Sequence, residues 1–444
     1  MCKYAEYGNC DPETKDQEYC LFHKPNKTEE EAERFYQKIL KKYQPKEEEL
    51  EEDVIVDRLG EKIKRYVFET EVNFRGYVFP ASKKFATFFN HAMFKNAVCF
   101  TNAKFEGPVF FVGTEFDGPV IFIGTVFMDT AFFWKTKFKS LSHFVGAKFW
   151  NNAEFIYTTF EIPPSFAGAI FKGEAIFDGV KFGRGGKFTD SVNFYDATFK
   201  DKVVFNNVTF KHDVYFSSTI IRNIWFKKDC SVEDPMFYGE VSFHGAKIDK
   251  IDIDLRGKCF RLPSAEAEVC RVLRLFYERE GMRDRADEVF VRERRALRRN
   301  RVFMAKKKVE EISGKSNWLS LVSVYFLFLV AVFSSWIEYL LADLPSRYGT
   351  SWKRPVVLWL INVLIVFPML YLVTGSIAYN YSDALSVNDF WTAIYFSVVT
   401  ATTLGYGDFH PVGALGRIIA SIEAVYGMFM WTVFLTVYAR KYMR

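Results

Sequence analysis

The sequence predicts a multidomain protein with a Phe-rich solenoid in its first half, a helical hairpin in the middle and an all-α membrane domain at its C-terminal end. Three observations lead to this prediction. The 444 residues include 49 Phe, and many of these recur at one short period. The charged segment 264–312 has the apolar periodicity of helices. After residue 318 come three apolar stretches, each about as long as a bilayer crossing requires.

Residues 1–23 contain four potential metal ligands, namely Cys2, Cys10, Cys20 and His23. Three thiolates and one imidazole complete the tetrahedral shell of a structural Zn²⁺, and so short a segment has few other means of holding a fold. We therefore expect a zinc-knuckle-like segment. The alternative is a set of unrelated surface thiols beside a chance His.

The segments around this cluster suggest a cytosolic first half. The N-terminus has no basic start followed by an apolar run, so no secretory signal is expected. In a reducing compartment, the seven Cys are expected to be metal ligands or buried small side chains rather than disulfides. Residues 24–73 are rich in Glu and Lys, and we expect a charged linker or a solvated helix there.

An 11-residue repeat runs through residues 92–179 in eight consecutive units, with Phe at the third and ninth position of each. From Phe94 to Phe177 the Phe spacings therefore alternate between five and six residues, a period that neither a helix nor a simple strand has. Such a repeat predicts coils that bury their Phe by stacking on the next coil. Two units per coil would give about seven coils, about 4.8 Å apart.

This repeat resembles the pentapeptide-repeat family, with Phe in the inward positions that usually carry Leu and with an extra residue in every second unit. The resemblance implies a right-handed β-helix, expected over residues 74–255. Residues 74–226 hold 17 Lys plus Arg against 12 Asp plus Glu, the wrong sign for the DNA mimicry of some family members. A partner of this domain would be an unknown protein or ligand.

Residues 264–312 have the apolar spacing of two helices separated at Gly281, which predicts a helical hairpin. Its second helix stays dense in Arg and Lys to residue 308. Such a run is typical of the cytoplasmic flank of a membrane segment, where anionic headgroups attract it. It lacks the interleaved aromatic residues of a nucleic-acid surface, so no nucleic-acid partner is expected.

Three apolar stretches are long enough to cross a bilayer: residues 319–341, 356–375 and 415–438. A shorter apolar stretch, residues 389–403, follows a capping box expected at Ser386 and Asp389. A helix this short cannot cross the membrane. It must instead enter and lead to irregular backbone that is protected or lined by water.

The short stretch ends in "TATTLGYGD", which resembles the pore sequence of two-span potassium channels. The resemblance implies a pore domain at 354–444, with an outer helix at 355–375, a pore helix at 388–402 and an inner helix at 413–440. The selectivity filter would be Thr403, Leu404, Gly405, Tyr406, Gly407 and Asp408, with Leu where Val or Ile is commoner. Potassium sheds its water only where oxygens replace it, so four copies of this backbone must direct carbonyls at one axis.

The same resemblance assigns supporting roles around the filter. Tyr395, Phe396 and Thr402 are expected to support it, and Tyr406 would point outward and brace against the first two. Well-studied members of the family carry a Glu, bonded to the filter Asp, where this chain has Val399.

Two residues of the inner helix are further candidates. Gly427 lies 19 residues after Asp408, where these channels place a gating hinge, although a glycine there equally suits a packing notch. Glu423 is an intramembrane carboxylate, which is costly and usually functional. We expect it to brace the pore helix through a hydrogen bond or to be protonated.

The expected sidedness of the chain conflicts with three crossings. The family places both ends of its helix pair inside, and the Cys/His cluster and the basic run are also expected inside. Residues 319–341 would then have both flanks in the cytosol. We therefore expect two crossings and a membrane-associated helix at 317–345. The alternative is a third crossing with the repeat domain outside.

Together these features predict a passive, homotetrameric, potassium-selective channel of the cell membrane with both termini in the cytosol. The repeat domain would be a sensor or scaffold, Zn²⁺ a structural ion, and K⁺ the permeant ion. A non-selective cation channel and a membrane-anchored interaction scaffold are the alternatives. An enzyme is not expected, because the six His are scattered and no nucleophile pairs with a base.

Overall fold

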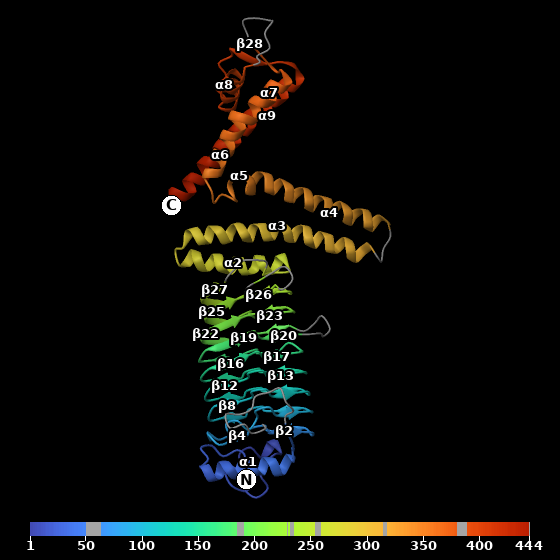
Figure 1. The fold of residues 1–444 in the computed structure, drawn as a ribbon, viewed down its shortest axis with the longest axis vertical. Coiled ribbons are helices and arrows are strands. Elements are labelled where there is room, and N and C mark those ends of the chain that lie inside the picture. The colour runs from blue at the N-terminus through green and yellow to red at the C-terminus, as the bar shows by residue number, and fades with distance from the viewer. Residues whose placement is uncertain are drawn as a thin grey trace. The chain divides into compact units, whose positions relative to one another are not determined.

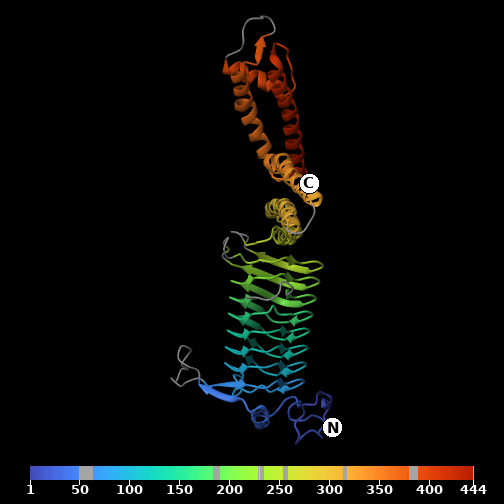
Figure 2. The same ribbon diagram turned by 90° about the vertical axis from the view of Figure 1, so that its right-hand side faces the viewer.

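The computed structural model describes residues 1–49, 64–183, 191–228, 230, 235–253, 259–313, 318–379 and 389–443. They belong to two units, Met1–Met282 and Arg283–Arg444. The described part of the first unit is a β-solenoid with a helix at each end, and that of the second is helical except for one short two-stranded ladder (Figures 1 and 2).

The solenoid has four faces of short parallel strands, and each strand pairs with its equivalents in the coils before and after it. Val120 pairs with Val98 on one side and with Ser142 on the other, so one coil takes 22 residues. One coil thus holds two 11-residue units, the condition under which about seven coils were expected.

The first face is β2 Lys64–Phe68, β5 Met93–Phe94, β9 Glu115–Phe116, β13 Lys137–Phe138, β17 Thr159–Phe160, β20 Lys181–Phe182 and β23 Thr209–Phe210. The second is β3 Val72–Asn73, β6 Val98–Cys99, β10 Val120–Ile121, β14 Ser142–His143, β21 Val192–Asn193, β24 Val214–Tyr215 and β26 Val241–Ser242. The third is β4 Val78–Phe79, β7 Lys104–Phe105, β11 Val126–Phe127, β15 Lys148–Phe149 and β18 Ile170–Phe171. The fourth is β8 Val109–Phe110, β12 Ala131–Phe132, β16 Ala153–Ile156 and β19 Ala175–Asp178. The longer strands β22 Thr198–Asn206, β25 Ile220–Lys227 and β27 Lys247–Ile253 continue both of the last two faces.

Buried Phe rings fill the inside of the coils. Because the same position recurs in every coil, each ring lies directly over its equivalent in the next. Phe116 stacks between Phe94 and Phe138 with centroids 5.1 and 5.2 Å apart and rings within 7° of parallel. Such stacking adds to the burial of large apolar surface, and it explains the high Phe content of the chain.

Helix α1, Glu29–Tyr43, covers the N-terminal end of the solenoid. Its apolar side packs there, with the ring of Phe35 5.4 Å from that of Phe79 and the ring of Tyr36 4.4 Å from that of Phe85. This part of the segment is a helix, as the second of the two expectations had it, but one side of it is buried rather than solvated, because an end coil exposes its core and needs an apolar cover. Strand β1, Lys46–Glu49, pairs antiparallel with β2. Residues 50–63 of the expected linker lie outside the described residues.

The last coils contain one covalent bond that was not expected from the sequence. Cys230 and Cys259 form a disulfide, although the sequence predicted none. The physical reason is stacking, since one coil brings the chain back until the two Cα atoms are 5.0 Å apart. Helix α2, Pro263–Arg279, then packs on β26 and β27. Residues 254–255, the expected end of the solenoid, lie outside the described part of the chain.

In the second unit, α3 and α4 run antiparallel. Helix α3 is Arg283–Ser313, and α4 is Trp318–Glu338. Arg301 of α3 binds Glu338 at 2.9 Å, whereas Arg295, further back along α3, binds Asp343 at 2.7 Å beyond the end of α4. The chain continues from α4 through a π-helical turn, Tyr339–Asp343, into α5, Leu344–Ser346.

The remaining helices form a hairpin with a short helix between its arms. They are α6 Lys353–Ile361, a π-helical turn Asn362–Val366, α7 Phe367–Thr374, α8 Phe390–Ala401 and α9 Gly413–Tyr442. Strands β28, Ile377–Tyr379, and β29, Phe409–Pro411, pair antiparallel beside α8. Among the described residues, three helical segments are long and apolar enough to cross a membrane: Leu321–Ser346, Lys353–Thr374 and Gly413–Tyr442.

Candidate functional site

Helix α8 leads directly into the loop that contains Gly405 and Gly407. Its N-cap is Asp389, whose Oδ2 accepts hydrogen bonds from the backbone N–H and the hydroxyl of Thr392, both at 3.0 Å. The capping box expected here had Asp389 as its second member, and Ser386, its first, lies outside the described residues. A carboxylate at this end also interacts favourably with the helix dipole.

The loop after α8 has a left-handed backbone at every second residue. The φ angle is +58° at Thr403, +58° at Gly405 and +81° at Gly407. When left-handed residues alternate with right-handed ones, successive peptide groups turn the same way, so their carbonyls lie on one side. Glycine adopts this conformation freely, but a β-branched Thr does not. The strain at Thr403 is therefore itself an indication of function.

A single chain leaves this loop uncovered. Leu404 is 59 % exposed and Tyr406 is 69 % exposed. A Cβ added to Gly405 or Gly407 would meet no described atom within 4 Å. Large apolar side chains that project from an ordered loop mark a surface that another molecule covers.

The three expected filter supports take different positions. The Tyr395 hydroxyl interacts with the carboxylate of Asp408, a partner that the sequence analysis missed after noting that Val399 supplies none. Phe396 is buried within the chain, and its ring packs edge to face on Tyr371 at 5.0 Å. Thr402 caps the C-terminal end of α8. The bracing of Tyr406 by Tyr395 and Phe396 stays a prediction.

Gly427 lies in the middle of α9, at its closest approach to α8. A Cβ at this position would lie 2.1 Å from the carbonyl oxygen of Ala401, so only glycine allows the two helices to touch here. Helix α9 runs unbroken through this residue. This conformation therefore shows the packing notch that was raised as the alternative, and the hinge stays a prediction.

Glu423 is fully buried and links three helices. It accepts a hydrogen bond from the Tyr371 hydroxyl of α7 at 2.6 Å and shares a short one with the Ser397 hydroxyl of α8. A carboxyl group away from water needs such partners. The contacts are those of a brace between helices, and what the brace does for a pore stays a prediction.

Ser397 also bonds to the outer helix, because a proline leaves a carbonyl there without a partner. Its hydroxyl lies 2.7 Å from the Val363 carbonyl oxygen, within the π-helical turn. In the π-helical pattern the N–H of residue 368 would bond to this carbonyl, but Pro368 has no N–H. Pro368 was the sequence signal for this contact.

The hydrogens of this cluster can be arranged in two ways. Ser397 has one hydroxyl hydrogen, and the Val363 carbonyl can only accept it. If that hydrogen goes to the carbonyl, the Ser397 oxygen accepts a hydrogen from a protonated Glu423, whose other oxygen accepts from Tyr371. In the other arrangement the Ser397 hydroxyl donates to Glu423, and the protonation of Glu423 stays a prediction.

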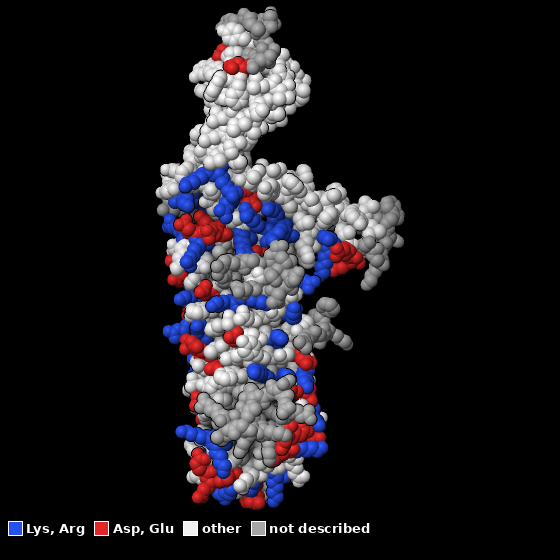
Figure 3. Space-filling view, in the orientation of Figure 1, with Lys and Arg blue, Asp and Glu red and all other residues white. Residues whose placement is uncertain are grey.

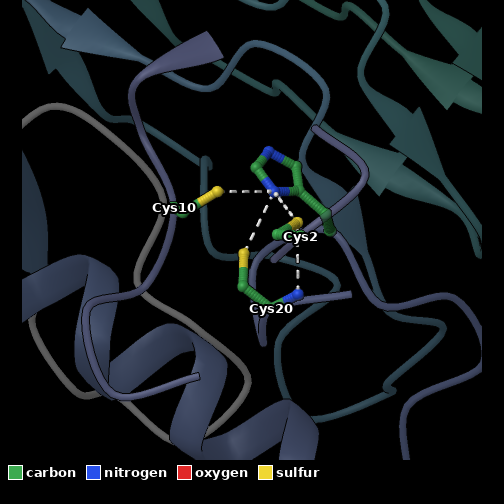
Figure 4. A group of neighbouring side chains, drawn as sticks. Cys2, Cys10 and Cys20 are labelled. Carbon is green, nitrogen blue, oxygen red and sulfur yellow. Dashed lines mark hydrogen bonds between the residues drawn. The ribbon is translucent and has the colours of Figure 1, made fainter. Parts of the chain in front are cut away.

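The second candidate site is the Cys/His cluster. The sulfurs of Cys2, Cys10 and Cys20 lie 3.5, 3.7 and 3.0 Å from Nδ1 of His23, and Figure 4 shows the three thiols converging on one imidazole. The four ligand atoms lie within 4.8 Å of one another. Tetrahedral Zn²⁺ with its usual bond lengths holds sulfur and nitrogen ligands about 3.5 Å apart, so the arrangement fits this ion.

The electrostatics of this cluster also fit a cation. Burial lowers the pKa of His23 to about 4, so its imidazole is neutral and can act as a ligand. The Nε2 atom lies 3.4 Å from the Arg75 carbonyl oxygen, which holds the hydrogen on that side and leaves Nδ1 open. Burial and the neighbouring thiol of Cys20 raise the pKa of Cys10 to about 12, because thiolates this close repel one another unless a cation lies between them.

Two parts of the chain match known families. Residues 366–444 match the family described as ion channel, and residues 89–137 match pentapeptide repeats. The chain joins an ion-channel domain to pentapeptide repeats. Its ion-channel domain contains the α8 loop, and its pentapeptide repeats form the solenoid.

Two curated relatives resemble short parts of the chain. Probable potassium channel protein 2 of Methanocaldococcus jannaschii is 32% identical over 76 residues, which are 17% of this chain and 20% of that protein. The calcium-gated potassium channel TvoK of Thermoplasma volcanium is 36% identical over 70 residues, which are 16% of this chain and 19% of that protein. The chain thus covers about a fifth of these relatives. No solved structure matches it.

Proposed function

We propose that the protein is a passive, potassium-selective channel that works as a homotetramer, with Thr403–Asp408 as its filter. The observation that carries the proposal is the loop after α8, where left-handed φ angles alternate in a segment that ends a half-length helix between two apolar helices. Carbonyls that point the same way can replace the water of a dehydrated ion. The negative end of the α8 dipole favours a cation near the start of the loop.

The exposure of the loop supports an assembly of several copies. Leu404 and Tyr406 have no cover within one chain, and one strand of carbonyls cannot surround an ion. Four copies around an axis would satisfy both needs. The names of both curated relatives include potassium channel, which supports K⁺ as the permeant ion.

We propose that α4 lies along the membrane surface rather than across the bilayer. Helix α3 packs along it, so a crossing would carry charged residues of α3 toward the hydrocarbon, where a charge at the centre of the bilayer costs about 2.5–3.5 kcal/mol. The outer side of α4, with Phe326 and Phe333, is apolar and exposed, as an interfacial helix requires.

Labelling in sealed vesicles tests this placement. Single cysteines at Lys308 and Thr350, introduced into a chain that otherwise lacks accessible thiols, would react with an impermeant reagent from the same side. Labelling from opposite sides would show that α4 crosses.

The solenoid would then lie in the cytosol with both termini, as a sensor or scaffold. Its N-terminal cluster of Cys2, Cys10, Cys20 and His23 would hold a structural Zn²⁺, which supplies the bonds that fold so short a segment.

Potassium flux from liposomes tests the main proposal. Gly405→Ala should abolish selective flux, because a side chain at φ +58° distorts the carbonyl row. Gly375→Ala is the matched control, since Gly375 has φ +57°, open space around it and a place outside the filter. Reversal potentials in mixed K⁺ and Na⁺ separate a selective channel from a non-selective one. Equal flux from both variants, or none from the wild type, would favour a membrane-anchored scaffold.

A further inference from the structure

A pocket of about 410 Å³ lies between α3 and the turn that follows α5, wholly within the second unit. Arginines dominate its lining, which consists of Glu288, Val291, Arg292, Arg295, Arg298, Arg299 and Arg347. Figure 3 shows Lys and Arg gathered over the α3 segment, with carboxylates among them. Five guanidinium groups around one pocket are unusual, because like charges repel unless something negative lies between them.

Two carboxylates are placed at this group of arginines, one in the lining and one beside it. Glu288 is the one carboxylate in the lining. Asp343 binds both Arg295 at 2.7 Å and Arg298 at 3.1 Å, so a single negative charge serves two arginines. Within the lining itself, arginines outnumber carboxylates by five to one, a composition that suits an anionic ligand.

Arg347 gives a second, independent indication. Its Nε is buried and has no hydrogen-bond partner among the described residues. The backbone at Arg347 and at Tyr348 is left-handed, with φ of +49° and +55°, which is uncommon for two successive residues other than glycine. A buried donor without an acceptor is costly, so this strained turn holds the guanidinium where an acceptor is expected to bind.

We propose that this arginine pocket binds the phosphate group of an anionic ligand. Several guanidinium forks suit the tetrahedrally arranged oxygens of a phosphate, which accept paired hydrogen bonds from more than one arginine. The volume exceeds that of a bare ion and leaves room for the rest of a headgroup or of a soluble phosphate ester.

Neighbouring contacts favour a lipid as the source of the phosphate. The N-terminal half of α3 meets the end of α9, where the Arg440 guanidinium lies 5.9 Å from the centre of the Phe290 ring. The same end of α9 carries Tyr442, whose hydroxyl accepts a hydrogen bond from the Trp352 indole at 3.2 Å. Such aromatic residues gather at the level of lipid headgroups. A ligand there would join α3 to the turn before the outer helix, beside the end of the inner helix.

Direct binding to the full chain in detergent tests the site without any measurement of flux. The lipid probe is dioctanoyl phosphatidic acid, and the soluble probe is inorganic phosphate. Arg347→Gln should weaken lipid binding about tenfold, the loss expected for one charge-assisted pair. Arg354→Gln is the matched control, because Arg354 is an exposed arginine seven residues further along and outside the lining. It should change binding by less than about twofold.

The arms of this experiment separate the sources. Saturable binding of the lipid alone identifies a headgroup, and equal binding of inorganic phosphate identifies a soluble phosphate compound. Equal effects of Arg347→Gln and Arg354→Gln, or equal binding of a fatty acid whose only anionic group is a carboxylate, would overturn the proposal. If Arg347→Gln does not fold, the double variant Arg292→Gln with Arg299→Gln replaces it. A channel that fails to conduct would leave this result unchanged.

Discussion

The solenoid and the ion-channel domain bury their side chains in opposite ways. Each coil of the solenoid covers the rings of the next coil of the same chain, so that Phe116 and Phe138 are fully buried in a single copy. The loop of the ion-channel domain leaves Leu404 and Tyr406 exposed. The comparison teaches that a repeat stacked on itself completes its own core, whereas the loop of the ion-channel domain leaves large apolar side chains exposed in one chain.

The two regions also use different forces between their parts. Stacked aromatic rings join the coils, and the contacts repeat without change along the solenoid. In the ion-channel domain one buried polar cluster, Glu423 with Tyr371 and Ser397, joins α7, α8 and α9. A substitution in the core of one coil should therefore lower the free energy of unfolding of the solenoid. A substitution in the polar cluster should weaken the contacts between the helices of the ion-channel domain.

The largest expected effect concerns the N-terminal end, where the solenoid depends on a cover. Removal of Zn²⁺ by a chelator, or Cys20→Ser, should unfold the first 23 residues, since zinc supplies about 10 kcal/mol or more to such small segments. Metal analysis should find one zinc per chain in the wild type and none in Cys20→Ser. Cys99→Ser, a half-buried cysteine outside the cluster, should keep the metal. A chain free of zinc with an intact N-terminal segment would refute a structural metal.

The next effect measures the stacked core. Phe138→Ala should lower the free energy of unfolding by about 3–5 kcal/mol, because it removes a fully buried ring and leaves a cavity. Phe132→Ala is the control, since this ring is only partly buried and lies on the outside of β12. Denaturant unfolding followed by far-UV circular dichroism measures both. Similar losses would mean that the inner stacks do not dominate the stability of the solenoid.

A smaller effect is expected in the polar cluster of the ion-channel domain. Glu423→Gln should cost less than about 0.5 kcal/mol, because an amide donates and accepts as a protonated carboxyl does. Glu423→Ala should cost about 2–3 kcal/mol, because it leaves the buried hydroxyls of Tyr371 and Ser397 without a partner. Thermal dissociation of the assembled protein measures these losses. A large loss for Glu423→Gln would show that the carboxyl is ionised.

The last effect concerns Gly427, whose substitution by Ala should cost no more than the loss of the Glu423 side chain. Gly427→Ala should cost about 1–3 kcal/mol, because the new methyl group forces α9 away from the Ala401 carbonyl. Val425→Ala, at an exposed position of the same helix, should have less effect. Thermal dissociation again measures stability, and single-channel recording measures gating. An Ala variant of unchanged stability with altered opening would support the hinge instead.

The sequence predicted the repeated core of the solenoid but not the helix that covers its N-terminal end. The alternating Phe spacing predicted a solenoid with a core of rings, because a fixed period in the chain becomes a fixed stack in space. The covering role of α1 was missed, since its few apolar residues, such as Phe35 and Tyr36, are outnumbered by Glu and Lys. Composition averaged over the segment hid an apolar side that covers the end coil.

In the ion-channel domain the motif predicted where the loop lies, but not the left-handed backbone of Thr403. The partners of Glu423 could not be predicted, because Tyr371 and Ser397 lie 52 and 26 residues away on other helices. The arginine pocket was visible only as a basic run along α3. Its remaining member, Arg347, comes from a separate turn.

By itself, the sequence determined the repeat, the apolar lengths and the glycines of the loop, because periodicity and backbone freedom belong to neighbouring residues. Only the tertiary structure decided that Asp408 meets Tyr395, that Gly427 is a packing notch, and that five arginines share one pocket. These are distances between residues far apart in the chain, and they depend on how the helices pack.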